Sequence, residues 1–82
     1  MTTRHLESQF HRRSGLTAVC MDLDPRTGEV PVRVTDSEGK NEVMLRFPYK
    51  ALGDPGLTDA LTRLYFGELN IRRARKAEKK KT

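Results

Sequence analysis

The sequence predicts a small α+β domain: an antiparallel sheet of three strands, or alternatively four, with one main helix packed on a face. Between residues 16 and 49, apolar and polar side chains alternate and two short turns interrupt them, which is typical of a strand meander. From residue 57, apolar side chains instead recur three and four positions apart, which indicates an amphipathic helix. A chain of 82 residues makes one domain with a small core.

Residues 1–15 are predicted either to form a short helix or to remain a flexible arm. Leu6 and Phe10 stand four residues apart, and His11 and its basic neighbours follow them. Cations are favourable near the carboxyl end of a helix. A threonine at the start provides a cap, and Gly15 can end the helix in the left-handed conformation.

Three strands are expected between residues 16 and 49. Residues 16–23 are apolar on both faces, which predicts a strand covered on both sides. The segments 24–28 and 36–41 have turn composition, and the segments 29–35 and 42–49 alternate as half-exposed strands. Pro31 conflicts with a central position for the second strand, because proline cannot donate to the ladder. Either Pro31 lies just before the paired segment, or the first strand is central and has an extra neighbour.

The main helix is predicted over residues 55–66. Asp54 followed by Pro55 fits a capped first turn, and Thr58 is a rival cap. The buried side is expected to consist of Leu57, Ala60, Leu61, Leu64 and Tyr65. If the helix continued, Glu68 would lie on that apolar side, and burying an unpaired carboxylate is costly. Gly67 is therefore the expected end, and residues 68–72 are the candidate fourth strand.

The charge of the chain is concentrated in its last residues. The whole chain carries +5, whereas residues 72–82 alone carry +6 and residues 1–71 about −1. This partition predicts a near-neutral domain over residues 1–71 and a basic C-terminal arm over residues 72–82. The cations of the arm are Arg72, Arg73, Arg75, Lys76, Lys79, Lys80 and Lys81.

A block of cations at one end of a chain is typical of an arm that neutralises the phosphates of DNA or RNA. Arg12 and Arg13 form a second, smaller basic group that would join the arm if the two ends of the chain meet. The competing interpretations are a solvated tail, an arm that binds an acidic protein, and one that binds an anionic membrane surface. Phosphate contacts do not read sequence, so a sequence preference is not predicted.

Three aromatic residues are candidates for a protein interface or for stacking on bases. Tyr65 and Phe66 come at the expected end of the helix, and Tyr49 follows the third strand. Exposed aromatic side chains are frequent anchors of protein interfaces and platforms for single-stranded bases. An unpaired edge strand would also permit a homodimer.

No residue set in the chain predicts catalysis, a metal or a cofactor. Cys20 lies among apolar residues, and the two histidines, His5 and His11, do not complete a nucleophilic site or a zinc site with it. Asp22 and Asp24 could hold a divalent cation, but a turn explains Asp24 better. A single cysteine favours a reducing, cytoplasmic setting, and neither a signal peptide nor a membrane span is expected.

These observations predict a small non-enzymatic, regulatory or accessory protein that binds nucleic acid. The alternative is a protein-interaction module or inhibitor, such as a viral or mobile-element protein, that binds a larger macromolecular or nucleoprotein machine.

Overall fold

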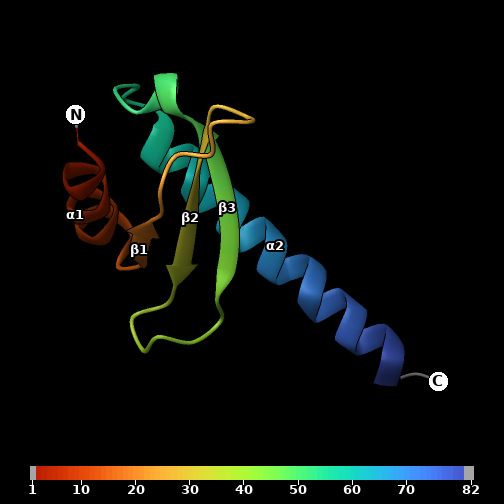
Figure 1. Cartoon of the computed structure of the whole chain (residues 1–82). Coiled ribbons are helices and arrows are strands. Elements are labelled where there is room, and N and C mark those ends of the chain that lie inside the picture. Colours follow the sequence, from red (N-terminus) through yellow and green to blue (C-terminus); the bar gives the residue numbers. More distant parts are fainter. Residues whose placement is uncertain (1, 81–82) are drawn as a thin grey trace.

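A computed structural model describes residues 2–80 of the chain, with side chains described for residues 2–76. It contains a three-stranded antiparallel sheet in the order β1-β2-β3 and two α-helices (Figure 1), which confirms the α+β class. The elements along the chain are α1 (Thr3–Ser14), β1 (Thr17–Cys20), β2 (Glu29–Thr35), β3 (Val43–Pro48), a short 3₁₀ turn η1 (Tyr49–Ala51) and α2 (Leu57–Lys80).

One hydrophobic core joins the sheet to both helices. Helix α1 lies beside β1 and also contacts α2, whereas α2 crosses behind the sheet and projects beyond it (Figure 1). The core side chains come from every element except η1, and most are aliphatic: Leu6, Phe10, Leu16, Ala18, Val30, Val32, Val34, Val43, Phe47, Leu52, Leu57, Leu61, Tyr65 and Leu69. The core therefore depends on both helices.

Residues 3–14 form the predicted helix rather than a flexible arm. The Thr2 hydroxyl accepts a hydrogen bond from the His5 N–H at 3.2 Å, and Gly15 ends α1 with a φ of 74°. Leu6 and Phe10 are fully buried, at 1% and 0% exposure. These two side chains anchor α1 in the core.

Pro31 lies inside the central strand, at the position where β1 stops. Residues 32–35 of β2 pair with β1, and Pro31 pairs with Arg46 of β3. The Met21 N–H donates to the Pro31 carbonyl at 2.9 Å. Residues that face each other at a hydrogen-bonded position of an antiparallel ladder exchange two such bonds, but proline has no N–H to donate. The ladder between β1 and β2 therefore ends here, so both the central position of β2 and the proline are accommodated.

The expectation that the first strand is covered on both faces is wrong. Strand β1 has four residues, and Val19 and Met21 are 41% and 39% exposed. Both helices lie on the other face of the sheet. Among the described residues, no helix or strand covers the face that carries Val19 and Met21. The outer edge of β1 is nonetheless covered by α1, because the Glu7 carboxylate accepts the Cys20 N–H at 2.9 Å.

The expected end of the main helix at Gly67 is also wrong. Helix α2 begins at Leu57, two residues after the predicted Asp54–Pro55 start, and continues through Gly67 to Lys80. Residues 68–72 are therefore helical, and the sheet has no fourth strand from them. The predicted domain limit at residue 71 falls within α2.

The helix can continue because its buried face differs from the expected one. Leu57, Leu61, Tyr65 and Leu69, each four residues after the last, are buried, whereas Ala60 and Leu64 are exposed and Thr58 is buried. Each four-residue step turns this face by about 40° around a helix of 3.6 residues per turn, so near Leu69 the buried face has turned away from the side of Glu68. Glu68 lies at its margin, 40% exposed, and its carboxylate is 3.8 Å from Arg72. Because the Glu68 carboxylate is partly exposed to solvent and lies near Arg72, the helix can continue without burying an unpaired charge.

Candidate nucleic-acid interface

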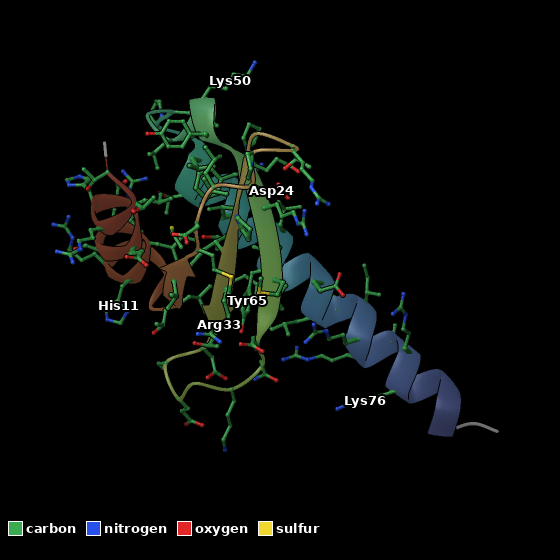
Figure 2. All side chains as sticks on the ribbon, viewed as in Figure 1. His11, Asp24, Arg33, Lys50, Tyr65 and Lys76 are labelled. Carbon is green, nitrogen blue, oxygen red and sulfur yellow. The ribbon has the colours of Figure 1, made fainter. Side chains whose placement is uncertain are left out.

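Four cations of the predicted arm, residues 72, 73, 75 and 76, lie on the half of α2 that projects beyond the sheet. Figure 2 shows Lys76 on this half, away from the strands. Arg72, Arg73, Arg75 and Lys76 are all exposed. Lys79, Lys80 and Lys81, which the charge pattern also assigns to the arm, lie outside the described side chains. The described cations are thus arranged along a helix whose first half is in the core.

Arg72 connects the projecting half of α2 to the sheet. Its Nη1 donates to the Glu42 carbonyl at 2.7 Å, and its Nε lies 3.8 Å from Glu68. The Tyr65 hydroxyl donates to the neighbouring Asn41 carbonyl at 3.0 Å. Both side chains thus hold α2 to the residues that precede β3. Sequence reasoning assigned Arg72 to phosphate contact alone and missed this second role.

A hollow of about 200 Å³ lies where α2 leaves the sheet, lined by Asn41, Leu69, Arg72, Arg73 and Lys76. No carboxylate is among these residues. Within residues 2–76, neither Arg73 nor Lys76 forms an ion pair. Leu69 adds an apolar wall, and Asn41 contributes a polar group from the turn before β3. The hollow therefore has the charge and size to accept a phosphate group.

Asn41 is held in place by the turn that precedes β3. Its side-chain N–H donates to Asp36 at 2.8 Å, and its φ of 55° is left-handed, a conformation that asparagine tolerates better than most residues. The Lys40 N–H donates to the other Asp36 oxygen at 2.7 Å and lowers the pKa of that carboxyl group. This turn thus supplies a fixed wall to the hollow.

Tyr65 was named as an interface residue, but its side chain is 1% exposed. Burial raises the pKa of its phenol, and Asp36 raises it further, while Arg72 and Arg73 oppose the rise. The phenol therefore stays protonated and donates to Asn41. Tyr65 therefore holds Asn41, one wall of the hollow, and is not a surface contact.

Phe66 and Tyr49 are exposed, at 48% and 54%. The Phe66 ring packs edge-on against Tyr65, with ring centroids 5.2 Å apart. Tyr49 begins η1, at the end of the sheet opposite the loop between β2 and β3 (Figure 1). The two exposed rings therefore lie on different elements, and Phe66 is the one on the helix of the basic residues.

Arg12 and Arg13 do not join the arm. With Gln9 they line a separate hollow of about 290 Å³ on α1, and Arg13 Nη1 lies 3.9 Å from the Asp59 carboxylate near the start of α2. Asp59 and Arg72 are thirteen residues apart, which corresponds to about 20 Å along a helix. The structure therefore has two basic regions and does not merge them into one surface.

Cys20 is half-buried, and its environment opposes a nucleophilic role. Burial, followed by the negative charge of Glu7, raises the pKa of the thiol to about 11. A nucleophilic cysteine needs a lowered pKa and a nearby base. His11 is the histidine nearest to Cys20 in the sequence and therefore the candidate base. Its Nδ1 lies 3.2 Å from the Leu16 carbonyl oxygen.

The raised pKa of Cys20 predicts that the thiol is alkylated slowly in the folded protein. At pH 8 the folded protein should react with iodoacetamide roughly 200-fold more slowly than the urea-unfolded chain, in which a cysteine pKa of about 8.5 applies, because the thiolate fraction falls by that factor. The rate is followed by mass spectrometry of the alkylated protein. Equal rates in the folded and unfolded states would show that Cys20 is not shielded as described.

Asp24 has the predicted turn role. Its Oδ1 accepts the Arg26 N–H at 2.9 Å, and Gly28 closes the turn with a φ of 71°. Among the residues that the structure describes, no group of three His, Cys, Asp or Glu side chains could hold a metal ion.

Within the same residues, no helix is both long and apolar enough to cross a membrane. No family model matches the chain, and no curated protein or solved structure is significantly similar to it.

Proposed function

We propose that this protein binds the phosphate backbone of nucleic acid through the projecting half of α2, as a non-enzymatic regulatory or accessory protein. The observation that supports the proposal is the position of Arg73, Arg75 and Lys76, which are exposed on a helix that leaves the body. Cations held in this way can each displace a counterion from a phosphate. The hollow beside Arg72 can hold one of these phosphates close to the sheet.

The proposal is tested by neutralising these three cations together: Arg73→Gln, Arg75→Gln and Lys76→Gln. Loss of three phosphate contacts should weaken binding to a duplex DNA or RNA oligonucleotide roughly 30- to 100-fold near 0.15 M salt. Fluorescence anisotropy of the labelled oligonucleotide measures the affinity. Glutamine is a good helix former, so circular dichroism should be unchanged.

A matched control changes the net charge equally but elsewhere. Arg4, Arg26 and Lys50 are exposed residues of α1, the first hairpin and η1. Replacing all three by glutamine should alter the affinity less than threefold. These charges lie away from the proposed binding half of α2, and salt screens electrostatic interactions over about 8 Å at physiological ionic strength. If both triple variants weaken binding equally, net charge acts rather than the helix, and the proposal fails.

The second candidate is a protein-interaction module or inhibitor, including one of viral or mobile-element origin, that acts on a nucleoprotein machine. The uncovered face of the sheet favours it, since Val19, Met21 and Met44 are 41%, 39% and 51% exposed there. Exposed apolar surface of this kind often marks a protein contact. A stoichiometric protein partner that remains after nuclease treatment, together with no affinity for oligonucleotides, would favour this candidate over the first.

We also propose that the protein works in a reducing, cytoplasmic compartment. Its single cysteine is a free thiol, and proteins of oxidising compartments usually pair their cysteines.

A further inference from the structure

Helix α2 carries an exposed stripe that the core does not use. The stripe consists of Ala60, Leu64, Gly67, Ile71 and Ala74, in which the spacing alternates between four and three residues. All five are exposed, and the two large members, Leu64 and Ile71, are 54% and 48% exposed. Spacing of this kind keeps side chains on one line of a helix that faces a second helix. We call these five residues the outer stripe.

Gly67 at the centre of the outer stripe has no explanation within one chain. It lies in the middle of α2, its φ is not positive, and a Cβ added there would meet no atom within 4 Å. Glycine is a poor helix former, and its two common justifications, a left-handed conformation and close packing inside the fold, are both missing. Close approach of another backbone is the remaining reason for a glycine.

The order of residues in the outer stripe identifies the second helix. Read outward from Gly67 in either direction, the stripe has a large aliphatic residue and then an alanine: Leu64 and Ala60 on one side, Ile71 and Ala74 on the other. We propose that α2 pairs with α2 of a second copy of this chain, antiparallel, with the two helices crossing at Gly67. Each Leu64 then packs beside Ile71 of the other copy, and each Ala60 beside Ala74. A contact related by a two-fold axis must be self-complementary in this way.

Charge selects the antiparallel arrangement. A parallel pair would bring the two basic halves of α2 alongside each other, with Arg75 of each copy nearest the contact, and like charges repel. In the antiparallel pair, residue 74 of each copy lies about 10 Å from the crossing in opposite directions, at a rise of 1.5 Å per residue. Glu68, which lies next to the crossing, is already paired with Arg72 at 3.8 Å.

The pairing does not require nucleic acid, so its failure and the failure of the proposed function are distinguishable. It is tested on the full chain, without nucleic acid, by sedimentation equilibrium over about 5 to 500 μM, a range in which weak self-association becomes visible. The wild type should change from monomer to dimer as its concentration rises. A chain that stays monomeric throughout would overturn the proposal.

Two variants assign the dimer to the outer stripe. Gly67→Ala should raise the melting temperature of the monomer at low concentration, because alanine favours helix and the site is open, yet weaken the dimer at least tenfold, because the added methyl groups separate the helices. Leu64→Gln combined with Ile71→Gln should abolish the dimer. Phe66→Gln, on another side of α2, is the control and should leave dimerisation unchanged. If Gly67→Ala dimerises as strongly as wild type, the crossing is not at Gly67.

Orientation is tested by cross-linking in a Cys20→Ser background. A mixture of chains carrying Ala60→Cys with chains carrying Ala74→Cys should form a disulfide between the two kinds of chain. Ala74→Cys alone should form little dimeric disulfide. The reverse result would mean a parallel pair and would refute the antiparallel arrangement.

Discussion

Raising monovalent salt from about 50 to about 200 mM is expected to weaken nucleic-acid binding by about 40-fold or more. Arg73, Arg75 and Lys76, if each contacts one phosphate, release three counterions, and the logarithm of affinity falls with that of salt with a slope of about −0.9 per contact. Further contacts would steepen the slope. Anisotropy titrations at four or more salt concentrations give the slope directly.

The triple glutamine variant supplies the control for this slope. Removing the three cations should reduce the magnitude of the slope of log affinity against log salt by about three, since each phosphate contact contributes about one to that slope. The variant with Arg4, Arg26 and Lys50 replaced should retain the wild-type slope. A flat response in wild type would mean that binding, if observed, does not depend on phosphate neutralisation.

Phe10→Ala is expected to cause the largest loss of stability of any single substitution in α1. The ring is fully buried, and removing a buried phenyl group costs about 3–5 kcal/mol through lost transfer energy and the cavity that remains. A domain of this size has a total stability of about 5–15 kcal/mol, so the melting temperature should fall by on the order of 15 °C or more. Urea titration followed by circular dichroism measures the change.

Phe66→Ala is the matched control, since it removes the same side chain from an exposed position. Its ring is 48% exposed and contacts Tyr65 edge-on at 5.2 Å. The expected loss is about 1 kcal/mol or less, because such an aromatic pair contributes about 0.5–1.5 kcal/mol and alanine favours the helix. Similar losses for the two variants would show that α1 is not anchored in the core as described.

The sheet was largely predictable because its period is two residues and its turns are short. Val30, Val32 and Val34 were expected on one face and are all buried at 1% or less. The helix of α1 followed from Leu6, Phe10 and Gly15. In each case the pattern is complete within a few neighbouring residues of the sequence, which is why local reasoning succeeded.

The course of α2 was not predictable from the same reasoning, because its buried face is chosen by the sheet. The sequence pattern argues against an unbroken helix only if Leu61 and Leu64 both face the core, because Glu68 would then lie between them in projection and be buried. The sheet instead contacts Leu61, Tyr65 and Leu69. These three residues are spaced four positions apart, and the spacing continues past Gly67. That regular spacing is the sequence signal that indicates the longer helix.

The candidate site was predictable in its residue types and not in its construction. A run of arginines and lysines is visible in the chain. The contact between Arg72 and Glu42, however, joins residues thirty positions apart, and the hollow depends on Asn41 as well as on α2. Local pattern contains no information about which turn a helix will pass as it leaves a sheet.

Because the same helix packs in the core and carries the cations, the direction in which Arg73 and Lys76 point is set by Leu61 and Tyr65. A flexible tail would have to give up conformational freedom on meeting a ligand. Here folding has already fixed the orientation of the basic half of α2, so the proposed binding would begin from a fixed geometry. Substitutions deep in the body, far from any ligand, can therefore re-aim the charged end by altering the tilt of α2.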